Sequence, residues 1–198
     1  MPATIDLPNQ AAAGIRYAYK ASLIGAAHQF ELTGDGLSWR IAGGSGMWPY
    51  AGISAIRLSY RPVSMQSRRF RADIENADGG RITIFSTTWQ TAALMAPQDR
   101  DYRAFMTQLH RRMAKAGSRA ALIGGLRPRV YAVAIILLTL VAVAISGLFA
   151  RAVATGEWAG ALFLIGFAML FAWQIGGFIS RNRPCAYAFD HLPAALLP

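Results

Sequence analysis

The sequence is poor in several kinds of residue, and each shortage excludes a class of protein or site. Cys185 is the single cysteine, so the chain can form neither an internal disulfide nor a metal site with several cysteine ligands. Acidic residues number 10, and none lies between Tyr102 and Gly156. From Val130 to Ser180 the only charged residues are Arg151 and Glu157. So long a region with only two charged residues excludes a chain that is soluble from end to end.

Two long apolar runs occupy this region. Val130 to Ala150 gives 21 residues without a charge, and Trp158 to Ser180 gives 23. At about 1.5 Å per residue, helices of these lengths reach roughly 31 and 35 Å, enough to cross a hydrocarbon core of about 30 Å. We therefore predict transmembrane helices at 130–150 and 158–180. The short loop at 151–157 makes them an antiparallel hairpin.

A polar, strand-rich region precedes the apolar runs. Residues 1–14 have no periodic pattern, which predicts a flexible lead. Apolar and polar residues alternate at 28–32 and 37–41 around a Gly-rich turn, and again at 70–75, which is typical of half-buried hairpins. We expect about six or seven short strands before a helix that begins near Pro97. This helix has an apolar stripe that predicts packing against the strands: Tyr102, Phe105, Met106, Leu109 and Met113.

These patterns predict an α+β soluble domain at 15–116 and an anchored C-terminal part. The soluble domain is expected to be a small antiparallel barrel or sandwich capped by one C-terminal helix. A basic juxtamembrane linker at 117–129 leads into the transmembrane hairpin, and a tail at 181–198 follows it.

The order of strands followed by one amphipathic helix resembles the pleckstrin-homology-like (PH-like) domains of bacteria, which are often fused to membrane helices. The likeness rests on the segment Trp48 to Ile56, the turn at Asp78-Gly79-Gly80 and the helix Asp101 to Met113. It implies a scaffold that binds lipids, peptides or partner domains. The basic inositide-binding motif between the first two strands is not matched, since Lys20 stands alone there.

The charge distribution predicts the orientation in the membrane. The net charge is +10, and six basic residues lie between Arg111 and Arg129, with Arg181 and Arg183 after the second apolar run. The connecting loop carries only Arg151. Positive residues stay on the cytoplasmic side, so we expect both termini in the cytoplasm and the loop in the periplasm, in the inner membrane of a bacterium. Residues 1–10 show no signal-peptide pattern.

Two sets of basic residues are candidate binding surfaces. The residues beside the first apolar run are expected to contact anionic lipids: Arg111, Arg112, Lys115, Arg119, Arg127 and Arg129. A second cluster is a candidate partner surface, with a plain solvated face as the alternative: Arg57, Arg61, Arg68, Arg69 and Arg71. Nucleic acid is not expected as a partner, because no reading motif or interleaved exposed aromatics accompany these arginines.

Small and polar residues in the second apolar run predict a helix-packing face. Ala168, Ala172 and Gly176 recur every four residues, and Gln174 is strongly polar. Such residues let another helix approach closely, either the first span of this chain or a helix of another subunit.

The sequence shows no catalytic, cofactor or metal constellation. Asp190 and His191 lack a nucleophile, and His28 and His110 lie in different elements. The sequence therefore predicts a non-enzymatic, membrane-anchored binding or scaffold module, an accessory or assembly component of a larger complex. A membrane-bound enzyme or a transport component are the alternatives.

Overall fold

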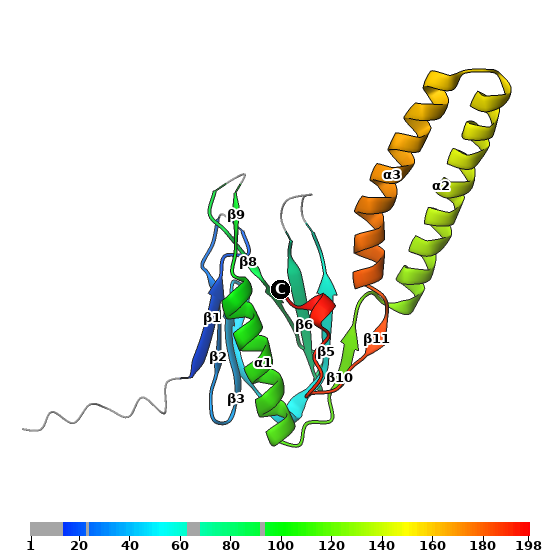
Figure 1. The fold of residues 1–198 in the computed structure, drawn as a ribbon. Helices are drawn as coiled ribbons and strands as arrows, with labels where there is room; N and C mark the ends of the chain where they lie inside the picture. Colours follow the sequence, from blue (N-terminus) through cyan, green and yellow to red (C-terminus); the bar gives the residue numbers. More distant parts are fainter. Residues whose placement is uncertain (1–13, 23, 63–67, 92–93) are drawn as a thin grey trace, which may run out of the picture.

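The computed structural model describes residues 14–22, 24–62, 68–91 and 94–198; the predicted lead at 1–14 therefore lies outside it except for Gly14. A β-rich domain carries one helix on its surface, and a long helical hairpin rises from one side of it (Figure 1).

The first sheet is a four-stranded antiparallel meander of neighbouring strands. It consists of β1 (Ile15–Tyr19), β2 (His28–Leu32), β3 (Gly36–Ile41) and β4 (Gly44–Pro49). The alternating pattern buries one face, including Tyr17, Phe30 and Leu32, and leaves the other face to solvent.

The second sheet has five strands in the order β11-β10-β5-β6-β7. After the short 3-10 helix η2 (Tyr50–Gly52), β5 (Ile53–Tyr60), β6 (Phe70–Asn76) and β7 (Arg81–Phe85) pair antiparallel. β10 (Ala121–Gly124) pairs parallel with β5, and β11 (Cys185–Ala186) pairs antiparallel with β10. β8 (Thr87–Trp89) and β9 (Met95–Pro97) form a separate small hairpin.

The core is shared by both large sheets and by α1 (Asp99–Lys115). All five residues of the predicted apolar stripe on α1 are fully buried, so the prediction that this helix packs on the strands is confirmed. The predicted α+β class is confirmed in its coarse form, with antiparallel sheets and helices. Within the described residues the sheets do not close into a barrel.

The hairpin consists of α2 (Pro128–Ala154) and α3 (Trp158–Arg181), two helices long and apolar enough to cross a membrane. Their outward side chains are strongly exposed; Trp173, for example, is 76% exposed. Such a surface is costly in water and ordinary against lipid tails. The helices begin and end within four residues of the bounds expected from the sequence.

The segments on either side of the hairpin differ from the prediction. The expected linker at 117–129 contains β10, and the expected tail at 181–198 contains β11 and the 3-10 helix η3 (Ala194–Leu196). Leu196 and Leu197 are buried in the domain core. Both segments belong to the folded domain because each adds apolar side chains to the core and β10 also extends the sheet.

Candidate functional site

The base of the helical hairpin is joined to strand β5 by several hydrogen bonds. The Gly125 amide donates to the carbonyl of Leu58 at 2.8 Å, and the Leu126 amide donates to the carbonyl of Asn182 at 3.0 Å. The Asn182 carboxamide bonds the backbone of Tyr60, whose ring lies 5.1 Å from the Arg181 guanidinium. The domain is therefore fixed to the point where α2 begins and α3 ends (Figure 1).

A basic groove lies at this junction, between the outer face of the five-stranded sheet and the start of α2. Strand alternation turns Arg57, Arg71 and Asp73 away from the core formed by Ile56, Leu58 and Ala72. The groove has a volume of about 260 Å³. We call it the arginine groove and define it by its charged residues: Arg57, Arg61, Arg71, Asp73, Arg81 and Arg127.

Asp73 organises one side of the arginine groove. It is only 4% exposed and accepts bonds from Arg71 at 2.7 Å, Thr83 at 2.7 Å and Arg81 at 3.0 Å. Burial alone would raise the pKa of Asp73, but the hydrogen bonds from Arg71 and Thr83 and the charges of Arg71 and Arg81 lower it below its usual value. Asp73 is therefore ionised at neutral pH and holds two guanidinium groups in place.

The other three arginines of the groove have no acidic partner in the part of the chain that the structure describes. Arg57, Arg61 and Arg127 form no ion pair with any residue that the structure describes. Arg57 is half-buried, and its buried Nη1 finds no hydrogen-bond partner within the same residues. A buried, unpartnered guanidinium nitrogen is costly unless a ligand accepts from it. The groove therefore carries more positive than negative charge.

The predicted partner surface is only partly brought together. Arg57, Arg61 and Arg71 line the groove, whereas Arg68 is exposed at the start of β6. The Arg69 guanidinium lies 3.7 Å from the centre of the Phe85 ring, a structural cation–π contact. Sequence reasoning missed Arg81 and Asp73, whose only signal was alternation in strands next to the cluster.

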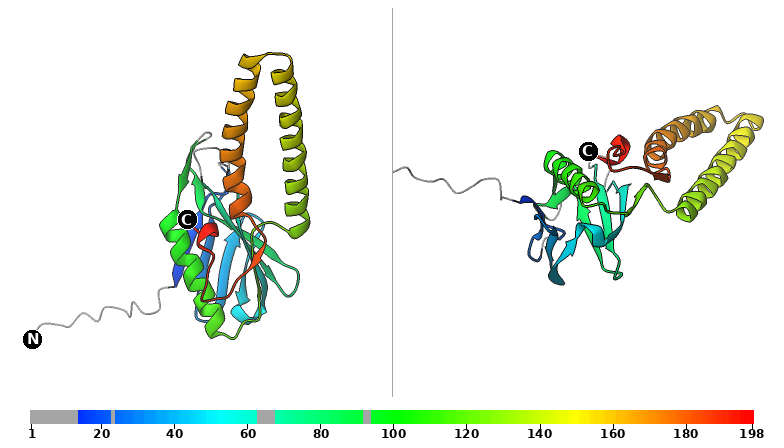
Figure 2. Two further views of the ribbon diagram at one scale, coloured as in Figure 1. Left: turned by 45° about the vertical axis from the view of Figure 1, so that its right-hand side comes forward. Right: turned by 90° about the horizontal axis from the view of Figure 1, so that it is seen from below.

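The predicted lipid contacts on α1 lie away from α2 and α3. The C-terminal end of α1, with Arg111 and Lys115, is at the end of the domain opposite the hairpin (Figure 1; Figure 2, left). Arg112 is half-buried and donates to the carbonyls of Leu32 at 2.9 Å and Thr33 at 2.6 Å.

The remaining predicted lipid contacts differ in position. Arg119 precedes β10 and is exposed, while Arg127 and Arg129 flank the first residue of α2. The linker prediction failed because the chain returns along β10, from the far end of the domain toward the hairpin (Figure 1). Only Arg127 and Arg129 of the predicted set lie beside the apolar helices.

Of the predicted small-residue stripe, Ala168 lies on the less exposed face of α3, and the other members do not. The less exposed residues of α3 follow alternating steps of three and four, as at Ala161, Leu164, Ala168 and Phe171. Residues four apart on a helix are displaced by about 40° around its axis at each step, so such a stripe turns away from the face of α3 that contacts α2. Ala172, Gln174 and Gly176 are exposed, and a side chain at Gly176 meets no atom of the described chain within 4 Å. Packing of Gly176 against the chain's own first span was a wrong prediction.

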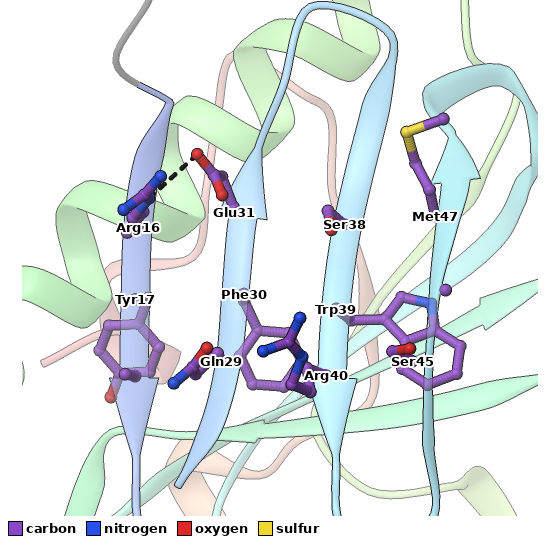
Figure 3. Close-up of a pocket in the computed structure, with 12 residues that line it drawn as sticks. Arg16, Tyr17, Gln29, Phe30, Glu31, Ser38, Trp39, Arg40, Ser45 and Met47 are labelled. Atoms are coloured by element: carbon purple, nitrogen blue, oxygen red, sulfur yellow. Dashed lines mark ion pairs between the residues drawn. The ribbon is translucent and has the colours of Figure 1, made fainter.

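A larger hollow of about 610 Å³ lies on the outer face of the first sheet (Figure 3). Side chains of four neighbouring strands line up across it, from Arg16 through Glu31 and Ser38 to Met47. Arg16 and Glu31 pair at 3.0 Å, so Arg40 is the one charged side chain of this lining outside an ion pair with a described residue. The hollow is a weaker candidate for binding an ion than the arginine groove.

The histidines considered from the sequence have structural surroundings. His110 is fully buried, with Nδ1 at 2.8 Å from the carbonyl of Met106 and Nε2 at 3.0 Å from the Tyr187 hydroxyl. His28 lies 3.3 Å from the Tyr19 hydroxyl. The exposed Asp190 and His191 pair only with each other, at 3.0 Å. Across 14–22, 24–62, 68–91 and 94–198, no group of three His, Cys, Asp or Glu residues is placed to hold a metal ion.

No protein-family model, curated protein or solved structure matches this chain. Function is therefore inferred from its own residues.

Proposed function

We propose that this protein is a non-enzymatic, membrane-anchored binding module that serves in the assembly of a larger complex in a bacterial inner membrane. In this proposal α2 and α3 cross the bilayer, and the β-rich domain binds an anionic partner group through the arginine groove. The observation that carries the proposal is the position of the groove, directly beside the first turn of α2.

The rigid junction supports a scaffold role. Hydrogen bonds from Gly125, Leu126 and Asn182 fix the sheet to the base of the hairpin. A domain on a flexible linker samples many orientations, whereas this one presents a single face at a fixed height above the bilayer. Fixed orientation favours assembly with other membrane components, because less freedom is lost on binding.

The charge distribution supports a cytoplasmic domain. Arg127, Arg129, Arg181 and Arg183 flank the domain end of the helices, and the opposite end carries Arg151 with Glu157. The positive-inside bias places the domain and the C-terminal segment together on the cytoplasmic side. Reporter fusions after Pro198 and within the 155–157 turn test this orientation. A reporter active outside the membrane after Pro198 contradicts it.

The PH-like resemblance remains a prediction. The order of strands followed by a helix that covers the core is consistent with this resemblance. The unclosed sheets and the parallel strand β10 depart from the small antiparallel barrel that it implies. The proposal does not depend on this resemblance, because it uses the groove and the hairpin alone.

Extraction in mild detergent followed by mass spectrometry of co-purifying proteins tests the assembly role. We expect a defined set of membrane partners with the natural protein. The triple change Arg57→Gln, Arg61→Gln and Arg127→Gln should release them, because it removes the unpaired charges of the groove. The matched control Arg111→Gln, Lys115→Gln and Arg119→Gln removes the same charge at exposed sites and should retain them. Equal loss in both variants, or no partner with the natural protein, contradicts the proposal.

A further inference from the structure

We infer that the arginine groove is a binding site for the phosphate of an anionic glycerophospholipid from the surrounding bilayer. The inference rests on the proposed function in one respect, since it requires that α2 and α3 cross the membrane. It names the anionic group that the groove receives and identifies the bilayer as its source.

The groove lies at the depth of the lipid headgroups. α2 has 27 residues. Its length is therefore about 40 Å, against about 30 Å for a hydrocarbon core and 40–45 Å with the headgroup layers. Both ends of α2 thus lie among headgroups. Val130, in the first turn, is 51% exposed and lines the groove. The groove therefore opens into the layer that contains lipid phosphates.

The charged groups suit a phosphate. Arginine binds phosphate through two parallel N–H donors, a geometry that lysine lacks. Arg57, Arg61 and Arg127 offer such donors without an acidic partner among the described residues. Asp73 binds Arg71 and Arg81, and Glu75 also pairs with Arg81 at 3.7 Å, so these two guanidinium groups add little net charge to the groove.

The start of α2 adds to this attraction. Pro128 is its first residue, and its first turn contains Arg129 and no acidic residue. The free amides of a helix start carry partial positive charge and favour an anion. This contribution strengthens the site, but the unpaired arginines are what define it.

Size and polarity favour a lipid over a soluble phosphate compound. A volume of about 260 Å³ lies just below the usual range of about 300–1,000 Å³ for pockets that enclose a whole small molecule. It accommodates a headgroup whose remainder extends outside. Leu126 and Val130 give the groove an apolar wall continuous with α2, along which an acyl chain can lie. A free sugar phosphate or nucleotide gains nothing from such a wall.

The full-length protein in mild detergent is titrated with phosphatidylglycerol, phosphatidylcholine and glycerol phosphate, and bound molecules are counted by native mass spectrometry. We expect saturable binding of one phosphatidylglycerol. Phosphatidylcholine should bind about tenfold more weakly, because its choline already compensates the phosphate charge. Glycerol phosphate should not displace the lipid, because it lacks the acyl chains.

The variant Arg57→Gln with Arg127→Gln should weaken phosphatidylglycerol binding by about tenfold or more, since each charge-assisted bond to a phosphate is strong. Arg111→Gln with Arg119→Gln, remote from the groove, should leave it unchanged. The exposed Arg61→Gln serves as a further groove variant if the double change unfolds the protein.

Equal binding of the two lipids, or equal loss in groove and remote variants, overturns the inference in favour of diffuse surface attraction. Displacement by glycerol phosphate assigns the groove to a soluble ligand. The lipid measurement does not depend on co-purifying proteins. Selective lipid binding without protein partners would contradict the assembly role alone, and protein partners without selective lipid binding would contradict the lipid site alone.

Discussion

The side chain of Asn182 bonds to the edge of strand β5 just beyond the point where the neighbouring strand β10 ends. The carboxamide Oδ1 accepts from the Tyr60 amide at 3.0 Å, and Nδ2 donates to the Tyr60 carbonyl at 2.9 Å. Two residues earlier on β5, Leu58 is bonded by the backbone of Gly125. Asn182 is fully buried. One side chain at the end of α3 thus satisfies both backbone groups of Tyr60, which in a longer parallel β10 would bond to two different residues.

Replacing Asn182 by alanine should destabilise the junction. The change leaves the backbone groups of Tyr60 without these partners, at a cost of about 1–3 kcal/mol. Thermal unfolding of the full-length protein in detergent measures the effect. Arg183→Ala, at the exposed next residue, is the control and should leave the midpoint nearly unchanged. Equal midpoints for both variants contradict the role given to Asn182.

Gly125→Ala should be more harmful than Gly117→Ala. Both glycines have positive φ, +80° and +67°, so alanine costs about 1 to 2 kcal/mol at each from the backbone alone. A Cβ at Gly125 would also overlap the carbonyl oxygens of Asn182 and Arg183, whereas Gly117 has open space within the described chain. Unfolding midpoints of the two variants test the difference. Similar midpoints would show that the junction adapts.

The stability of the domain should fall as the pH drops below about 6.5, the usual pKa of histidine. Burial lowers the pKa of His110, only partly offset by its bond to Met106, and burial also lowers the pKa of His28. Below pH 6.5 the unfolded chain therefore binds protons that the folded chain does not bind. The contribution of these histidines to the free energy of unfolding is fully present above pH 6.5 and is lost as the pH falls below it.

The pH dependence is measured as the unfolding midpoint at about pH 7.5 and about pH 5.5, within the range where histidine titrates. His110→Phe should reduce the difference between the two midpoints, since the buried titrating group is gone. His191→Gln, an exposed residue, should keep it. If the difference is the same in His110→Phe, the buried imidazole is not its source.

The seam between α2 and α3 should tolerate a large side chain at Gly176 and not at Ala161. Ala161 is 4% exposed, so Ala161→Leu overpacks the helix pair, at a cost of about 1–3 kcal/mol. Gly176→Leu places its side chain in open space of the described chain. Unfolding in detergent compares the two. A strong loss with Gly176→Leu, accompanied by a smaller particle in size-exclusion chromatography, would indicate contact with another subunit.

The parts that the sequence predicted well have local, repeated signals. The uncharged runs before and after Arg151 located both helices, and the alternating pattern located hairpins such as β2 and β3. The stripe from Tyr102 to Met113 located α1 and its buried face. Each of these patterns repeats within a few turns or a few strand residues, so it is readable without knowing the neighbours.

The missed parts depend on contacts between distant segments. β10 has four residues and β11 has two, too short for a periodic pattern, and their pairing joins segments on both sides of the hairpin. The arginine groove likewise combines Arg57 of β5, Asp73 of β6 and Arg127 before α2. The sequence likewise did not show that the α1 arginines lie away from the apolar helices, because the direction of β10 depends on its pairing with β5.

The pairing of β11 with β10 has a consequence for biogenesis. The chain is synthesised from its N-terminus, so residues 14–126 leave the ribosome before α2 and α3, and Cys185 and Leu196 leave it after both helices. In the proposed transmembrane arrangement, the edge of β10 and part of the core stay uncovered until α2 and α3 are inserted and the C-terminal segment lies on the side of the domain. If the hairpin were inserted with the wrong topology, the C-terminal segment would lie on the other side of the bilayer from the domain. The edge of β10 would then stay open, and an open sheet edge promotes aggregation and degradation. In the proposed transmembrane arrangement, β11 can therefore complete the sheet only after the hairpin has been inserted with both of its ends on the side of the domain.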